Sequence, residues 1–231
     1  MNLKDKVILI TGAGSGLGRA LALAAGEARA KVICAGRRKD RLQKTAEEVT
    51  KAGGVGTMVE MDVTDPLSVE KGLKQAEKAG PVEILINNAG IITGLKAVQE
   101  LPIEEWDKIM ATNVRGPHLL LRAILPGMIQ RGFGRVVNIS APIKHLPKAS
   151  AYCASKCALD SLTKAMTAIL CKGLEGTTPK AVMELESDFV PKIVGAQLVR
   201  VRSQTTYYIL SRMKGICKVW LDRKRASIGE S

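Results

Sequence analysis

The sequence predicts an α/β protein built on one doubly wound parallel sheet, with helices on both faces. Short apolar runs alternate with helix-length amphipathic segments from the N-terminus to about residue 172, which is the rhythm of βαβ units. Most of the apolar runs are near-continuous in Val, Ile and Leu, as expected for strands that helices cover on both faces. With an aromatic fraction of 3%, the core is expected to consist of aliphatic side chains.

The individual elements follow from this rhythm. Strands are expected at 6–11, 31–35, 57–61, 82–87 and 135–140. Helices are expected at 17–28, 39–52 and 66–78, as a pair within 103–130, and at 151–172, where apolar residues recur at helical spacing. The rhythm degrades after Gly173. We therefore expect one domain at 1–172, and at 173–231 an atypical C-terminal segment that is not a separate domain and leaves the fold incomplete.

Composition and charge exclude several classes of function. The net charge of +13 would suit a nucleic acid, an acidic membrane surface or a phosphorylated ligand. Most basic residues are scattered and aromatic stacking platforms are absent, so no nucleic-acid partner is expected. Five cysteines without a Cys-x-x-Cys spacing, and two histidines, indicate neither a disulfide framework nor a metal site. No apolar stretch suits a signal peptide or a membrane span, so a cytoplasmic location is expected.

A glycine-rich loop at residues 11–18, TGAGSGLG, follows the first expected strand and opens a helix. Glycines let the backbone turn sharply and approach a pyrophosphate, and the helix N-terminus presents free N–H groups to it. The spacing is T-G-x-x-x-G-x-G, because Leu17 stands where the G-x-G-x-x-G fingerprint has its last glycine. The loop therefore predicts a dinucleotide site.

Further motifs follow this loop in a fixed order: Asp62-Val63 after the third strand, Asn87-Asn88-Ala89-Gly90 after the fourth, Asn113 in the next helix, and Tyr152-Cys-Ala-Ser-Lys156. Over residues from about 3 to 172 the chain resembles the short-chain dehydrogenase/reductase family, and within it 3-oxoacyl-[acyl-carrier-protein] reductase-like members. The resemblance implies a Rossmann-type fold. It also implies cofactor contacts, with the pyrophosphate and ribose at Gly12, Ser15, Gly16 and Leu17, the adenine at Asp62 and Val63, and the central cofactor at Asn88, Ala89 and Gly90.

The residues after the second strand favour NADPH over NADH. Enzymes that use NAD usually carry an acidic residue there, which accepts a hydrogen bond from the ribose 2'-hydroxyl. This chain has Gly36-Arg37-Arg38 instead. Guanidinium groups suit a 2'-phosphate, and each charge-assisted bond contributes about 1.5 to 3 kcal/mol. A solvated basic loop is the alternative.

Tyr152 and Lys156 are the candidate catalytic pair. Their i, i+4 spacing places both on one helical face, where the ammonium favours phenolate and lowers the pKa of the tyrosine from about 10 toward operating pH. Such a donor suits the proton that a carbonyl takes up when hydride arrives from a nicotinamide. By the resemblance, Lys156 also holds the nicotinamide ribose, both residues border the cofactor, and Asn113 anchors a water that relays protons.

The catalytic serine departs from the family pattern. Members usually read Asn-x-Ser-Ser, and the second serine bonds to the substrate carbonyl; here that position is Ala141. Ser140 is the nearby candidate, although strand alternation would point its side chain opposite to that of residue 141. The loop to Tyr152 is shorter than in the family, and the resulting shift would bring Ser140 into place. A buried serine bonded to the backbone is the alternative.

These features predict an NADPH-dependent oxidoreductase that reduces a 3-oxoacyl thioester or a small hydrophobic ketone to an alcohol. The alternative is a catalytically weak or inactive NADPH-binding scaffold or sensor, which Ala141 and the atypical C-terminal segment would favour. Nucleic-acid binding rests on charge alone. A homodimer through the helix at 151–172 is the expected assembly.

Overall fold

The computed structural model describes residues 2–141 and 146–173. The chain divides into two compact units, residues 1–163 and 164–231, and the account below concerns the first unit together with the helix that begins in it. The expectations for the atypical C-terminal segment fall almost entirely on residues outside the described ones. The boundary at 172 and the incomplete fold therefore stay predictions.

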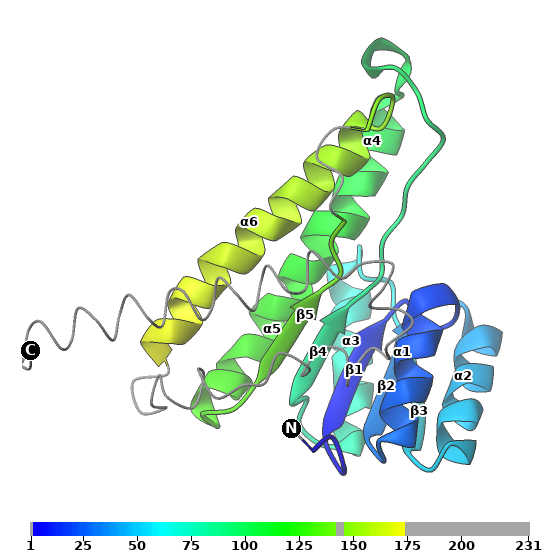
Figure 1. The fold of residues 1–231 in the computed structure, drawn as a ribbon, viewed down its shortest axis with the longest axis vertical. Helices are drawn as coiled ribbons and strands as arrows, with labels where there is room; N and C mark the ends of the chain where they lie inside the picture. Colours follow the sequence, from blue (N-terminus) through cyan, green and yellow to red (C-terminus); the bar gives the residue numbers. More distant parts are fainter. Residues whose placement is uncertain (1, 142–145, 174–231) are drawn as a thin grey trace, which may run out of the picture. The chain divides into compact units, whose positions relative to one another are not determined.

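Within the described residues, five parallel strands form one sheet in the order β3-β2-β1-β4-β5 (Figure 1). The strands are β1 (Val7–Thr11), β2 (Lys31–Gly36), β3 (Val55–Glu60), β4 (Ile84–Asn87) and β5 (Arg135–Asn138). The strand order reverses direction between β1 and β4. In doubly wound sheets, ligands bind outside the carboxyl ends of the strands at this reversal.

Helices flank the sheet on both faces, so the predicted fold class is confirmed. They are α1 (Gly16–Glu27), α2 (Lys39–Lys51), α3 (Pro66–Ala76), α4 (Ile103–Met110), α5 (Gly116–Gln130) and α6 (Ser150–Gly173), with single turns η1 (Glu77–Ala79), η2 (Val98–Glu100) and the π-helical η3 (Ala111–Arg115). Helix α1 packs against α2, and α3 packs against α5 (Figure 1). In the described part of the chain, no helix has the length and apolarity that a bilayer crossing needs.

The strand boundaries differ from the predicted ones by at most two residues. Central strands are buried on both faces, and Leu9, Ile33 and Leu85 are fully inaccessible to solvent. One difference affects the site: β5 ends at Asn138, before the predicted end at residue 140. Ser140 therefore lies beyond the strand, and strand alternation does not decide the direction of its side chain.

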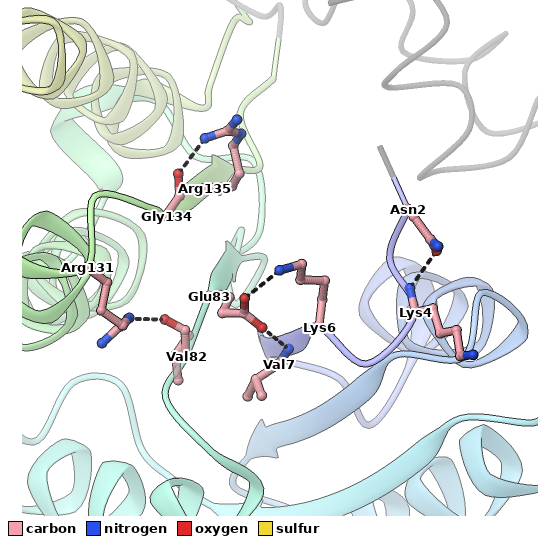
Figure 2. Close-up of polar contacts among 9 residues, drawn as sticks. All are labelled: Asn2, Lys4, Lys6, Val7, Val82, Glu83, Arg131, Gly134 and Arg135. Atoms are coloured by element: carbon pink, nitrogen blue, oxygen red, sulfur yellow. Dashed lines mark hydrogen bonds and ion pairs between the residues drawn. The ribbon is translucent and has the colours of Figure 1, made fainter. Parts of the chain in front are cut away.

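Polar contacts tie the amino ends of β1 and β4 together (Figure 2). Lys6 Nζ lies 2.7 Å from Glu83 Oε1, and the other carboxylate oxygen of Glu83 accepts a hydrogen bond from the Val7 N–H at 3.0 Å. Arg131, at the end of α5, donates to the carbonyl of Val82 at 2.9 Å. These contacts fix the relative height of two neighbouring strands, and hence the height of their carboxyl ends, where the motif residues lie.

Candidate active site

The glycine loop after β1 is joined to the loop after β4 by Thr11 and Asn88. The hydroxyl of Thr11 accepts hydrogen bonds from the N–H groups of Asn88 and Ala89, both at 3.0 Å, and donates to Ile86 O. The carboxamide of Asn88 donates in return to Thr11 O at 2.9 Å and Gly12 O at 3.4 Å. The predicted role of Asn88 in supporting the cofactor thus begins with a structural role: it holds the glycine loop in place.

The loop places the start of α1 against its own backbone. Gly12 has φ +67°, a left-handed conformation that glycine adopts without strain. A Cβ at Gly18 would lie 2.3 Å from Gly12 O, so only glycine permits this approach. Ser15 is the N-cap of α1, but its side chain makes no capping hydrogen bond. The first N–H groups of α1 therefore suit an anion, and the loop fits a dinucleotide pyrophosphate.

Arg38 lies beside this loop, as its predicted role requires. It precedes α2, and its guanidinium donates to Ser15 Oγ at 2.9 Å while remaining exposed. Arg37 is also exposed. The structure therefore brings one of the two predicted phosphate-binding arginines to the edge of the glycine loop. The other lies next to it in the turn between β2 and α2.

The residues predicted to border the adenine follow β3. The carboxylate of Asp62 accepts hydrogen bonds from Thr64, at 2.9 Å from the N–H and 2.8 Å from the hydroxyl. It does not cap α3, because Asp65 does so through the N–H groups at the start of that helix. Val63 is buried, and a Cβ at Gly116 would lie 2.9 Å from its side chain. Asp62 thus shapes the turn that carries Val63.

Asn113 lies in the π-helical turn η3 and is 1% exposed. Its Oδ1 accepts from the Ile91 N–H at 2.8 Å, and its Nδ2 donates to Ile91 O at 2.9 Å and to Ser155 Oγ at 3.0 Å. Its side chain therefore joins the segment after β4 to α6. Turns of this kind are frequent at functional sites. The predicted water held by Asn113 stays a prediction.

Lys156 and Asn113 converge on Gly90. Lys156 is 5% exposed, and its Nζ donates to Ile139 O at 2.8 Å and lies 5.6 Å from the centroid of the Tyr152 ring. A Cβ at Gly90 would come within 3.5 Å of Lys156 Nζ and 3.4 Å of Asn113 Oδ1. The predicted pair on α6 therefore lies against the loop after β4, next to the strand that carries the glycine loop.

Ser140 follows β5 near this cluster in the chain. Its hydroxyl oxygen is buried and has no hydrogen-bond partner among the described residues. A buried hydroxyl is rarely left without a partner, because desolvation then goes uncompensated. The alternative of a serine satisfied by backbone is therefore not what the described residues show.

Two further residues belong to this arrangement and were not singled out from the sequence. Thr11 opens the glycine motif, and its position directly before Gly12 is the signal that points to it. Ser155 is fully buried within the Tyr152–Lys156 motif, yet nothing in the local pattern separates it from an ordinary helical serine. Both act through partners far away in the chain.

Other chemistry is less well supported by the described residues. No group of His, Cys, Asp and Glu side chains among them is placed to hold a metal ion. Burial in β2 raises the pKa of the Cys34 thiol to about 12, so it is a core residue rather than a nucleophile. What remains is a glycine loop suited to a pyrophosphate and a buried lysine beside a tyrosine.

The fold and this arrangement define an NAD(P)-dependent oxidoreductase. The sequence profile of the short chain dehydrogenase family matches residues 6–172, and the chain belongs to that family. A short chain dehydrogenase of Pseudocercospora fijiensis is 33% identical over 220 residues, which cover 94% of this chain and 70% of that protein.

Solved structures agree with this assignment. A short-chain type dehydrogenase/reductase from Mycobacterium marinum superposes with a TM-score of 0.70 at 36% identity, covering 75% of this chain and 72% of that one. A metagenomic short-chain oxidoreductase in complex with NADP gives a TM-score of 0.71 at 30% identity, covering 75% and 80%. The family named from the sequence motifs is therefore confirmed.

Proposed function

We propose that this protein uses NADPH to reduce the carbonyl of a 3-oxoacyl thioester or a small hydrophobic ketone to an alcohol. The observation that carries the proposal is the convergence of Lys156 and Asn113 on Gly90, one loop away from a glycine turn suited to a pyrophosphate. This convergence supports a reaction centre at the carboxyl end of β4, where a nicotinamide would have to lie.

The preference for NADPH is supported by Arg38. Its guanidinium contacts Ser15 at the mouth of the glycine loop, where the ribose attached to the adenine would come close. The neighbouring carboxylate at the end of β3, Glu60, lies 3.1 Å from Lys39 Nζ, so an ion pair offsets its charge. A 2'-phosphate would therefore meet guanidinium groups, and the metagenomic relative was solved with NADP.

The proposed chemistry divides between the cofactor and this chain. NADPH, when bound, supplies hydride to the carbonyl carbon. The Tyr152 hydroxyl donates its proton to the carbonyl oxygen, so that a C–H and an O–H bond form and the carbonyl is reduced to the alcohol. The ammonium of Lys156 stabilises the phenolate that remains until solvent returns the proton. The unpartnered hydroxyl of Ser140 is suited to orient the carbonyl.

The proposal extends to assembly and location. One face of α6 carries small side chains, at Ala154, Cys157, Ala158 and Ser161, and Cys157 and Ser161 are exposed. Such a face would let the same helix of a second copy approach closely, which supports a homodimer through α6. The cysteines described by the structure are free thiols, as suits a protein that works in the cytoplasm.

NADPH oxidation over a panel of ketones and 3-oxoacyl thioesters, followed at 340 nm as is usual for this cofactor, tests the proposal. A fluorescence titration with NADPH and NADH accompanies the assay. Turnover that needs the carbonyl compound, together with tighter NADPH binding, is the expected result. Ala141 at the usual serine position favours one other function, a scaffold or sensor. NADPH binding without turnover of any compound would favour that function instead.

A further inference from the structure

Ser155 lies between the two predicted catalytic residues of α6 and is 0% exposed. Its hydroxyl donates to Tyr152 O at 2.7 Å and accepts from Asn113 Nδ2 at 3.0 Å. One buried oxygen therefore joins the backbone beneath the tyrosine to the π-helical turn η3.

The direction of each hydrogen bond in this chain is determined. The Ile91 N–H can only donate, so the Asn113 atom that faces it must be the carbonyl oxygen. This leaves Nδ2 of Asn113 to donate to Ser155, which then has its own proton available for Tyr152 O. The order of partners is Ile91, Asn113, Ser155 and Tyr152, and reversing any single bond would leave two donors or two acceptors facing each other.

We infer that Ser155 is a positioning residue: it sets the height of Tyr152 and Lys156 on α6 relative to Gly90. The inference rests on the proposed function, since it concerns the same reaction centre. Asn113 is held to the segment after β4 by both the N–H and the carbonyl of Ile91, so its amide is a fixed point. Ser155 transmits that fixed point to the backbone carbonyl of Tyr152. Errors of about 1 Å in such positions can cost a hundredfold in rate.

A second hydroxyl on α6 makes the same pattern of bonds and provides a matched control. Thr163 Oγ1 accepts from Asn138 Nδ2 at 2.8 Å and donates to Leu159 O at 2.7 Å. It joins α6 to β5, whereas Ser155 joins α6 to η3. Removing either hydroxyl takes away one asparagine contact and one contact to a helix carbonyl. Only Ser155 bonds to the carbonyl of a residue placed in the catalytic pair.

The kinetic test compares Ser155→Ala with Thr163→Val, both of which keep the approximate shape of the side chain. Ser155→Ala is expected to lower kcat at least about tenfold with NADPH Kd within about twofold, because positioning matters in the transition state more than in cofactor binding. Thr163→Val is expected to keep kcat within about twofold of the unsubstituted protein. If kcat were unchanged in Ser155→Ala, fell in parallel with NADPH affinity, or fell equally in Thr163→Val, the inference would be overturned.

The second test does not need turnover. Hydrogen exchange at the Ile91 amide, which donates to Asn113, is expected to accelerate at least about tenfold in Ser155→Ala, while the amide of Leu9 in the sheet core is unchanged. Unchanged exchange at Ile91 would show that Ser155 does not hold Asn113. If the unsubstituted protein turns over no compound, the proposed function fails and this measurement still decides the role of Ser155. Should Ser155→Ala not fold, Ser155→Cys keeps a weaker donor and acceptor, and smaller losses in the same two quantities are expected; no loss in either contradicts the inference.

Discussion

The two ends of the sheet solve the same structural problem with different chemical groups. At the amino ends of β1 and β4, a carboxylate, Glu83, binds the Lys6 ammonium and the Val7 N–H. At the carboxyl ends, neutral carboxamides and a hydroxyl join the strands: Asn87 donates to Asn138, and Asn88 and Thr11 bond to each other's backbone. The segments that directly follow β1, β4 and β5, at 12–18, 88–95 and 139–141, contain no Asp or Glu.

This difference follows from what each end has to do. An ion pair neutralises both of its members, so it suits an end that only holds strands together. A carboxylate beside the glycine loop would repel the phosphates of a dinucleotide by several kcal/mol in a partly buried site, at the roughly 4 kcal/mol expected for charges about 4 Å apart near a surface. Amides provide the same connections without that repulsion. The amino end is therefore expected to control stability, and the carboxyl end cofactor binding and rate.

The largest expected effect is at the carboxyl end, from Tyr152→Phe. The substitution keeps the ring and removes the proton donor, so turnover is expected to fall by about a hundredfold to ten-thousandfold while NADPH affinity stays within a few-fold. The measurement is NADPH oxidation together with a fluorescence titration. Lys156→Ala should damage both quantities, because Lys156 is placed both beside the tyrosine ring and against Gly90. Substantial activity in Tyr152→Phe would show that the acid is misassigned.

Gly18→Ala is expected to have the next largest effect. Its Cβ would lie 2.3 Å from Gly12 O and 2.4 Å from the carboxamide of Asn88, so the glycine loop must shift. Such overpacking is expected to lower the free energy of unfolding by about 1 to 3 kcal/mol and to weaken NADPH binding more than tenfold. Thermal unfolding and a cofactor titration measure the two effects.

Gly94→Ala is the control for this substitution, because a Cβ at Gly94 would meet no atom within 4 Å. If Gly18→Ala bound NADPH as tightly as Gly94→Ala does, the close approach of α1 to the loop would not matter for the cofactor. The carboxyl end would then tolerate changes in backbone geometry that the comparison between the two ends says it cannot.

Replacing Arg37 and Arg38 together with Ala is expected to weaken NADPH binding at least tenfold, about 1.4 kcal/mol, and to leave NADH nearly unchanged. The Arg38 contact to Ser15 predicts that Arg38→Ala alone accounts for most of this loss. Lys44→Ala on α2 removes a similar exposed charge and controls for general electrostatics. Equal losses for the two cofactors would mean that these arginines do not recognise a 2'-phosphate.

The sequence was sufficient for features that depend on local pattern. The glycine loop, the Tyr152–Lys156 spacing and the alternation of elements all involve neighbouring residues, and each strand was placed within two residues. Ser155 was missed because its partner Asn113 is 42 residues away, and the partners of Thr11 lie 77 and 78 residues away. The end of β5 was misplaced for a similar reason. It is set by pairing with β4, whose last residue, Asn87, pairs with Asn138.

The smallest expected effect is at the amino end, where Glu83→Gln should lower stability and leave cofactor binding unchanged. Burial tends to raise the pKa of Glu83, but the hydrogen bonds from Lys6 and the Val7 N–H outweigh it, and the pKa is lowered overall. A carboxyl with a lowered pKa in the folded state stabilises the protein above its unfolded pKa, and this contribution is lost as pH falls through the folded pKa. We expect Glu83→Gln to cost about 1 kcal/mol at pH 7, as for a partly buried pair with one backbone hydrogen bond.

This cost should shrink as pH falls below the ordinary glutamate pKa of about 4.3, because protonated Glu83 resembles glutamine in charge. Urea unfolding of both proteins between pH 7 and pH 3, with NADPH titrations at pH 7, gives the required comparison. Glu70→Gln is the control: Glu70 also pairs with a lysine, Lys74, but that pair lies on the exposed face of α3, so solvent screens it and the change should be much smaller. If Glu83→Gln weakened NADPH binding as strongly as it weakened folding, the two ends of the sheet would not be separable, and the division between holding strands and binding cofactor would have to be abandoned.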